Sequence, residues 1–159
     1  MTLYILDAYA LAELTSTTPL ARLSSAETQN LLTDLAEAGN LEITGDTLTQ
    51  LQEHLPQHHV TAWLRASRSS VVRGGSPYTF IDEVLRSCSA LLDPNDLDPN
   101  PQVHVLALAL QRIAEGNAVI VVTGENTDPP GRCSLETACV AAGVHHISPD
   151  EFATALVTI

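Results

Sequence analysis

The chain has 159 residues, of which 45% are hydrophobic, and its formal net charge is −12. This length suits a single domain with a substantial core, so we expect one domain over residues 1–159. The acidic balance argues against the basic surface that drives nonspecific nucleic-acid binding, although a site for divalent metal must itself be acidic. No apolar run is long enough to cross a membrane and no leader pattern opens the sequence, so we expect a cytoplasmic protein without a membrane partner.

Strands and helices are predicted to alternate along the first half of the chain. The opening residues read LYILD, an apolar strand pattern that ends on an acid, Asp7. A capping box, in which the side chains of Ser24 and Glu27 each accept from the other's backbone N–H, predicts where a longer helix begins. The predicted elements of this half are strands at 3–7 and 41–45 and helices at 8–15, 25–38, 46–55 and 60–72.

The second half continues this alternation. The run AVIVVT is apolar throughout, which is typical of a buried parallel strand. Residues 78–92 read either as a helix or as a short strand that leads into one. Strands separated by helices predict an α/β protein, a three-layer α/β/α fold with a mainly parallel central sheet. The other predicted elements are helices at 103–116, 134–143 and 148–156 and strands at 118–123 and 144–147.

Acidic residues follow the strands of this predicted sheet. Because the carboxyl ends of parallel strands share one edge, Asp7 and Glu125, each just after a strand, are expected to lie close together. Asp98 stands in the loop before the helix that leads to the second of these strands, and Glu53 follows Gln50 by three residues on one helix face. Three or four such oxygen ligands form a pocket suited to Mg²⁺ or Mn²⁺, which activates water for phosphodiester cleavage.

Three segments together resemble the PIN domain family. They are ILDAYALAEL at the start, VLALALQRIAEGNAVIVVTGE in the centre and SLETACVAAGVHHISPDEF near the end. In order and spacing they resemble the family's first acidic motif, its helix, glycine, strand and Thr-x-acid motif, and its closing helix, strand and helix. The resemblance implies the metal-dependent ribonuclease fold found in VapC-type toxins of bacterial toxin–antitoxin pairs.

The resemblance also implies a function and a set of site residues. The expected activity is that of an endoribonuclease that uses Mg²⁺ or Mn²⁺ to cleave RNA, as the toxin of a toxin–antitoxin pair. The expected protein partners are an antitoxin and a second copy of the chain. Asp7, Asp98 and Glu125 would hold the metal, with Glu53 as a fourth catalytic acid.

All seven basic residues are arginines, and three of them fall in the stretch WLRASRSSVVRGG. Arginine binds phosphate through a bidentate fork. Arg65 and Arg68 from this stretch and Arg132 from the loop DPPGR are therefore candidates for the substrate phosphates. The alternatives are a solvated helix face for the first two and a salt bridge within the loop for the third.

The chain departs from the family pattern where the family has small polar or acidic residues, and only Asp7 and Glu125 match cleanly. Fewer carboxylates weaken the hold on a metal ion. A second hypothesis follows: a catalytically weakened or inactive PIN-like module that acts by binding protein or RNA, with Asp7 as a helix cap. The departing residues are Tyr9, Gln50, Asn100, Gln102 and His104.

Two other sequence features bear on zinc binding and on nucleotide hydrolysis. His54 and His58 have the four-residue spacing of zinc ligands on a helix, but Pro56 interrupts the helix between them, which argues against zinc. The sequence also lacks the GxxxxGK motif of nucleotide hydrolases. Three cysteines without CxxC spacing are expected to be reduced and mostly buried, as in a cytoplasmic protein. They are Cys88, Cys133 and Cys139.

Overall fold

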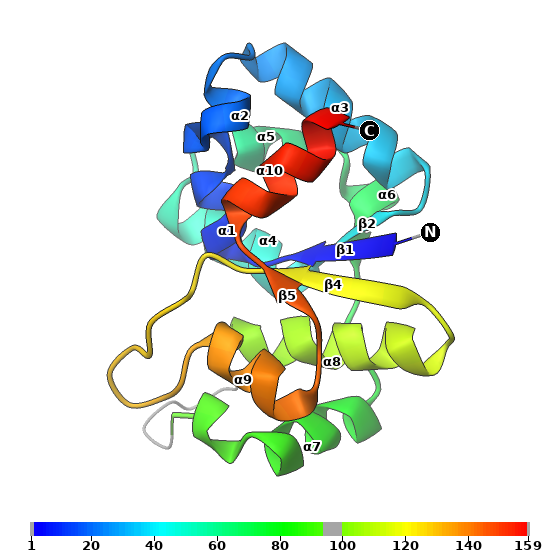
Figure 1. The fold of residues 1–159 in the computed structure, drawn as a ribbon, viewed down its shortest axis with the longest axis vertical. Helices are drawn as coiled ribbons and strands as arrows, with labels where there is room; N and C mark the ends of the chain where they lie inside the picture. The colour runs from blue at the N-terminus through cyan, green and yellow to red at the C-terminus, as the bar shows by residue number, and fades with distance from the viewer. Residues whose placement is uncertain (1, 94–99, 159) are drawn as a thin grey trace.

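The computed structural model describes residues 2–93 and 100–158. Within these residues five strands form one parallel sheet in the order β3-β2-β1-β4-β5. Figure 1 shows this sheet across the middle of the molecule, with helices on both faces. The predicted α/β/α fold with a parallel central sheet is confirmed. The strands are β1 (Thr2–Leu6), β2 (Leu41–Thr44), β3 (Val72–Arg73), β4 (Ala118–Val122) and β5 (His146–Ile147).

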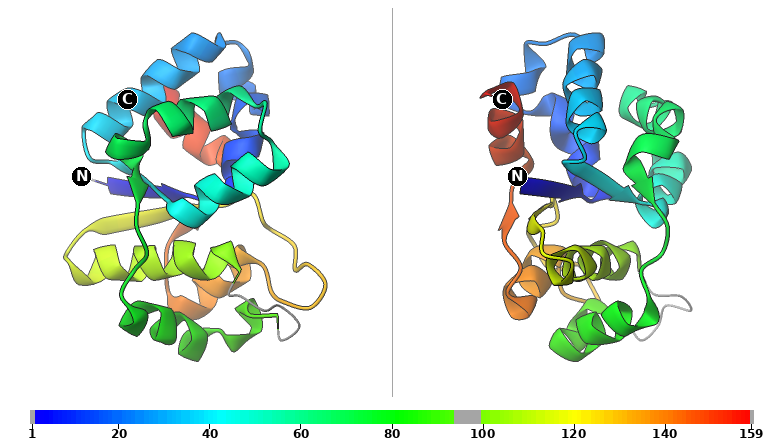
Figure 2. Two further views of the ribbon diagram at one scale, coloured as in Figure 1. Left: turned by 180° about the vertical axis from the view of Figure 1, so that it is seen from behind. Right: turned by 90° about the vertical axis from the view of Figure 1, so that its right-hand side faces the viewer.

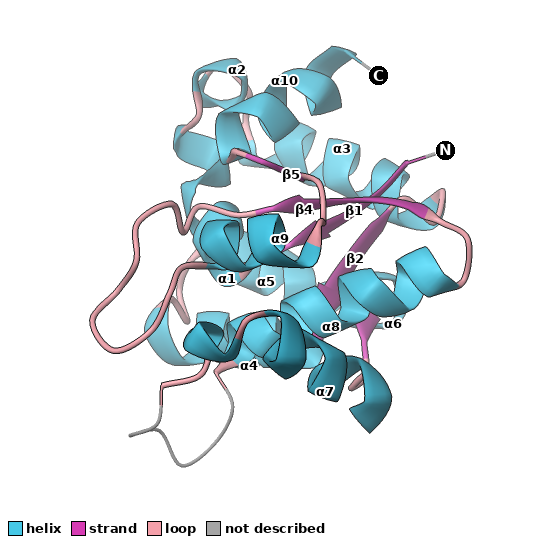
Figure 3. Ribbon diagram, turned by 60° about the horizontal axis from the view of Figure 1, so that its bottom comes forward, coloured by secondary structure: helices cyan, strands magenta, loops and turns pink. Residues whose placement is uncertain are grey.

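The helices form the two outer layers, which are also seen in the turned views (Figure 2) and in the view coloured by secondary structure (Figure 3). In the described residues they are α1 (Ala8–Glu13), η1 (Leu14–Ser16), α2 (Thr18–Ala21), α3 (Ser25–Glu37), α4 (Gly45–His54), α5 (His59–Ala66), α6 (Arg68–Val71), α7 (Tyr78–Ser87), η2 (Ser89–Leu91), α8 (Pro101–Ala114), α9 (Leu135–Ala142) and α10 (Pro149–Thr158). One layer contains α7, α8 and α9, and most of the others lie on the opposite face.

The central strand β1 contributes to both cores. Successive side chains of a strand point to opposite faces of the sheet. Leu3 and Ile5 pack with α7, α8 and α9, whereas Leu6 packs with α1, α3 and α10 on the other face. Each fully buried side chain of this kind contributes about 1.5–3 kcal/mol to folding. Because its side chains pack into both cores, β1 lies in the middle of the molecule. Its last residue stands at the carboxyl edge, the edge of the sheet where the parallel strands end.

The prediction of one helix over 60–72 is wrong. The structure has two short helices, α5 and α6, that meet at Ser67 and lead into the edge strand β3. Val72 and Arg73 pair with the end of β2, and the Arg73 guanidinium donates to Glu42 on that strand at 3.1 Å. Pairing with β2 overrides the helical pattern at the end of this segment.

Two further boundaries differ from the prediction. The segment 78–92 is helical in α7 and η2, so no strand opens it. Helix α8 begins two residues earlier than predicted, because the Asn100 side chain caps it by accepting from the backbone N–H of Gln102 at 2.9 Å. Among the described residues, no helix is both long enough and apolar enough to cross a membrane.

Candidate functional site

The carboxyl edge of the sheet brings Asp7 and Thr123 together. Strands β1 and β4 pair in register, with Leu6 opposite Val122, so the next residue of each strand lies beside the other. The backbone N–H of Asp7 donates to the Val122 carbonyl at 3.1 Å, which continues the pairing past the last strand residue. The expectation that residues after these two strands converge is therefore met by the fold.

Asp7 is fully buried and accepts hydrogen bonds from four groups. Its Oδ1 accepts from the backbone N–H groups of Ala10 at 2.7 Å and Gly124 at 3.4 Å. Its Oδ2 accepts from the Gln102 amide at 2.9 Å and the Thr123 hydroxyl at 2.5 Å. Burial raises the pKa of Asp7 from 3.8 to about 6, while these hydrogen bonds act in the opposite direction. Asp7 is thus a helix cap and also the centre of a buried hydrogen-bond network.

Gln102 is the group that links α8 to this network. It lies in the first turn of α8, behind the Asn100 cap, and only 2% of it is exposed. The resemblance expects an acid near this position, which would accept hydrogen bonds or bind a cation. Gln102 instead donates to Asp7, so it supplies a neutral partner for the carboxylate.

Glu125 is also buried, but its partner is a cation. The two guanidinium nitrogens of Arg132 donate to its two carboxylate oxygens, each at 2.7 Å. The backbone N–H of Leu135, at the start of α9, donates to the same carboxylate at 2.7 Å. The hydrogen bonds to Glu125 are the main cause of the raised pKa of Arg132. This is the bidentate geometry in which arginine binds carboxylates most strongly.

Tyr9 lies next to this ion pair. The side chain is partly exposed, at 38%, and it stands two residues after Asp7 in the first turn of α1. Its pKa is raised, first by burial and then by the negative charge of Glu125, while Arg132 lowers it. A bulky phenol therefore occupies the position where the family resemblance expects a small polar residue.

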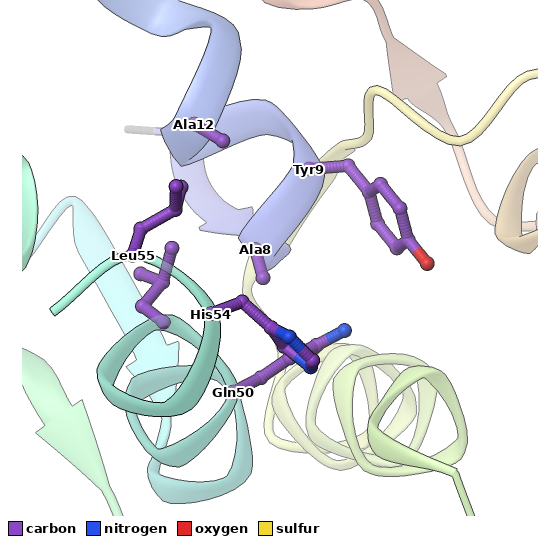
Figure 4. Close-up of a pocket in the computed structure, with 7 residues that line it drawn as sticks. Ala8, Tyr9, Ala12, Gln50, His54 and Leu55 are labelled. Atoms are coloured by element: carbon purple, nitrogen blue, oxygen red, sulfur yellow. The ribbon is translucent and has the colours of Figure 1, made fainter. Parts of the chain in front are cut away.

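A pocket of about 320 Å³ opens beside Tyr9, between α1 and α4. Figure 4 shows the Gln50 and His54 side chains extending from α4 toward the space below Tyr9. The walls are mainly apolar, and they include Ala8 and Leu51. The Gln50 Oε1 atom is buried and has no hydrogen-bond partner within the described part of the chain. Gln50, where the sequence departs from the acid that the resemblance expects, thus lines this pocket as an amide.

Of the other predicted acids, Glu53 does not join this cluster. Glu53 is exposed on α4 and does not line the pocket, although it lies one turn from Gln50. Asp98 lies outside the described residues. His104 has its Nδ1 atom 3.9 Å from a carboxylate oxygen of Asp46 on α4. The described residues therefore bring Asp7 and Glu125 to one edge but not Glu53.

The predicted phosphate-binding arginines fall in different surroundings. Arg132 forms the ion pair with Glu125, which is the alternative that the sequence left open. Arg65 is exposed on α5 and its guanidinium donates to the Pro56 carbonyl at 3.5 Å, and Arg68 is exposed at the start of α6. The solvated-face interpretation thus agrees with the exposure of these two residues.

The residues that the structure describes at this edge do not fit a Mg²⁺ or Mn²⁺ ion, and the predicted ligand Asp98 lies outside them. Among residues 2–93 and 100–158, no group of three or more His, Cys, Asp or Glu side chains is placed to hold a metal. The oxygens of Asp7 are taken up by neutral donors, and both oxygens of Glu125 are held by a guanidinium. Divalent cations need several free oxygen ligands around one point. The same finding covers the histidines of the EHLPQHH stretch, where His58 instead caps α5 through its Nδ1 atom.

Sequence reasoning missed the two side chains that donate hydrogen bonds to Asp7. Gln102 and Thr123 lie 95 and 116 residues away from it in the chain. One signal was available, because Thr123 directly follows the most apolar strand and so had to share the carboxyl edge with Asp7. The side chain of Gln102 carried no comparable signal, since glutamine in the first turn of a helix is ordinarily exposed.

Comparisons with known proteins do not add a family. No protein-family model matches the chain, and no curated protein matches it either. The PIN resemblance, with the antitoxin and the homodimer that it implies, therefore stays a prediction.

Proposed function

We propose that this chain is a PIN-like α/β module that binds a protein partner and does not cleave RNA. In this proposal Asp7 and Glu125 are structural groups at the edge of the sheet. The observation that carries it is the pairing of both Glu125 oxygens with Arg132 of the same chain, at 2.7 Å each. The guanidinium brings to this carboxylate the positive charge that a metal ion would otherwise supply.

The surroundings of Asp7 support the same proposal. Its two oxygens already accept from two backbone N–H groups and from the side chains of Gln102 and Thr123. A ligand that displaced these donors would leave buried polar groups unpaired, at a cost of about 1–3 kcal/mol each. Asp7 is therefore best described as a hydrogen-bond acceptor that joins α1, α8 and the end of β4.

The charge of the chain favours a protein partner over RNA. Proteins contact RNA phosphates mainly through Arg and Lys, and the net charge here is −12 without any lysine. Within the described residues, four of the seven arginines form ion pairs with acids of the same chain and so are not free to bind phosphate. A protein with a basic surface matches this charge. The paired arginines are Arg73, Arg86, Arg112 and Arg132.

The first experiment tests the absence of ribonuclease activity. Wild type and Asp7→Asn are incubated with Mn²⁺ and a pool of structured and single-stranded RNA. We expect neither protein to cleave RNA, and we expect Mn²⁺ to leave the melting temperature unchanged, because a bound ion would raise it.

A second candidate function is the metal-dependent endoribonuclease, the toxin of a toxin–antitoxin pair, and one observation favours it. Asp7 and Glu125 converge on one edge, with the Thr123 hydroxyl donating to Asp7 and accepting from the Glu125 backbone N–H at 3.0 Å. Mn²⁺-dependent cleavage by wild type that Asp7→Asn abolishes would overturn the binding proposal and establish this candidate.

The second experiment tests the class of partner. A labelled arginine-rich peptide and a labelled single-stranded RNA of similar length are titrated with the protein, and binding is followed by fluorescence anisotropy. We expect the peptide to bind at low ionic strength and to dissociate as salt screens the charges, and we expect no binding of RNA. Binding of RNA without cleavage would instead assign the module to RNA.

A further inference from the structure

Cys88 and Cys133 are 45 residues apart in the sequence, yet their sulfur atoms lie 3.3 Å from each other. Both thiols are free. Cys88 ends α7 and is half-buried, whereas Cys133 is buried just before α9. A disulfide has an S–S distance of about 2.05 Å, so a movement of roughly 1 Å would join the two atoms.

The backbone around both cysteines is held by hydrogen bonds. The Cys88 N–H donates to the Val84 carbonyl at 2.8 Å, which fixes it to the last turn of α7. The Cys133 N–H donates to the Ala90 carbonyl at 2.7 Å, which fixes it to η2. These hydrogen bonds hold the backbone of both cysteines while their sulfur atoms lie 3.3 Å apart, so forming a bond requires little change in the chain.

Arg132 is hydrogen-bonded to the backbone of Cys133. Its guanidinium donates to the Cys133 carbonyl at 2.8 Å as well as to the carboxylate of Glu125. Leu135, two residues after Cys133, donates its N–H to that carboxylate. A covalent bond at Cys133 would thus restrain both groups that hold Glu125.

We propose that Cys88 and Cys133 are a redox modification site, at which a small-molecule disulfide converts the two thiols into an intramolecular disulfide. The bond ties the end of α7 to the segment that carries Arg132. This inference goes beyond the proposed function and does not depend on it, because it concerns only the two thiols and the backbone around them.

The reaction proceeds by two thiol–disulfide exchanges. Cys88 is the more accessible thiol, so its thiolate attacks the small-molecule disulfide, forms a mixed disulfide and releases the first small thiol. The Cys133 sulfur then attacks the Cys88 sulfur, its proton passes to the departing thiolate, and the second small thiol leaves. The two cysteines lose two protons and two electrons, and the small disulfide gains them. Burial raises the pKa of the Cys133 thiol, which keeps the fraction of its thiolate small and makes this second step the slow one.

The bond is expected to stabilise the fold. It closes a loop of 45 residues and so restricts the unfolded chain. For a domain of this size we expect the melting temperature to rise by about 5 to 10 °C on oxidation. Amide hydrogen exchange in residues 132–137 is expected to slow at the same time.

The experiment uses the full chain, oxidised overnight with oxidised glutathione and analysed by non-reducing peptide mapping. Wild type is expected to yield a linked Cys88–Cys133 peptide pair and the higher melting temperature. Cys133→Ser is expected to stop at a glutathione adduct on Cys88. Cys139→Ser is the matched control, because Cys139 is fully buried elsewhere in the same core and its loss is expected to leave the linked pair unchanged.

Three results would overturn the proposal. The first is that the peptides containing Cys88 and Cys133 stay unlinked in the folded wild-type protein. The second is that Cys139→Ser removes the link. The third is a linked protein whose melting temperature is lower than that of the reduced form, since the bond would then strain the fold.

Discussion

Asp7 and Glu125 lie at the same edge of one sheet, and both are buried, but their surroundings stabilise them in different ways. Among the described residues, Asp7 has neutral donors from three parts of the chain and no cation as a hydrogen-bond partner. Glu125 has a bidentate arginine and one backbone N–H. A buried carboxylate without a counter-charge responds by taking up a proton more readily, and the pKa of Asp7 rises accordingly. Because of this difference, we expect the contribution of Asp7 to stability to depend on pH. The contribution of Glu125 is expected to depend on its arginine partner.

The different surroundings of the two acids also matter for function. A metal site needs neighbouring carboxylates with free oxygen atoms, and here each of the two acids has its own set of protein partners. The edge therefore contains two hydrogen-bond networks, one around each acid, and the Thr123 hydroxyl belongs to both. A change at Asp7 or at Arg132 acts mainly on one of the two networks, whereas a change at Thr123 acts on both.

The largest expected effect comes from Arg132→Ala. This change leaves Glu125 as a buried carboxylate without its cation, in a pair whose side chains are only 12% and 5% exposed. Removal of one partner of a buried ion pair costs about 3–5 kcal/mol, so we expect the free energy of unfolding, measured by urea denaturation, to fall by that amount. Glu125→Gln combined with Arg132→Gln is the control, and it should recover much of the loss. A loss below about 1 kcal/mol in the single variant would show that the pair contributes little.

The next effect is a pH dependence that Asp7 causes. Its folded-state pKa of about 6 lies above the unfolded value of 3.8, so the folded state binds the proton more tightly between these values. The free energy of unfolding therefore falls as pH rises through this window, by on the order of 3 kcal/mol in total. Asp7→Asn lacks this titration. Relative to wild type, the variant should become more stable as pH rises from about 3.5 to 7.

Urea denaturation of both proteins across this pH range measures the effect. The decisive quantity is the difference between the two stability curves, since all other titrating groups are shared. Parallel curves would contradict the raised pKa of Asp7. If the variant instead becomes more stable relative to wild type as pH falls, the carboxylate of Asp7 is stabilised as an anion.

Thr123→Val should have a smaller effect on both sides of the edge. The variant keeps the shape of the side chain but removes the hydroxyl that donates to Asp7 and accepts from the Glu125 N–H. We expect a loss of about 1–3 kcal/mol in unfolding free energy and a further rise in the pKa of Asp7. NMR titration of the Asp7 carboxyl carbon measures the second effect. An unchanged pKa would show that the hydroxyl does not stabilise the anion.

Glu53→Gln should have the smallest effect. The side chain is exposed on α4 and lies outside the edge network, so its loss should change stability by about 0.5 kcal/mol or less. The variant is a matched comparison for Asp7→Asn in the RNA and Mn²⁺ experiments, since both remove one predicted acid. A change in Mn²⁺ response or in RNA cleavage with Glu53→Gln would restore this residue to the candidate site.

The sequence by itself determined the alternation of strands and helices, the parallel sheet and the position of Asp7 at the end of β1. It also located the helix start at Ser24 with Glu27, whose reciprocal hydrogen bonds the structure contains. These features depend on hydrophobic period and on contacts three residues apart, and both are visible in a linear pattern.

The tertiary structure alone decided which groups surround the two acids. The packing of the helices and strands sets which side chains come within hydrogen-bond distance. It brings Gln102 to Asp7, Arg132 to Glu125 and Cys88 to Cys133. The short strand β3 likewise exists because β2 offers it a partner. A sequence shows that an acid stands at the edge of a sheet, but its protonation and its freedom to bind depend on neighbours that the fold brings from far along the chain.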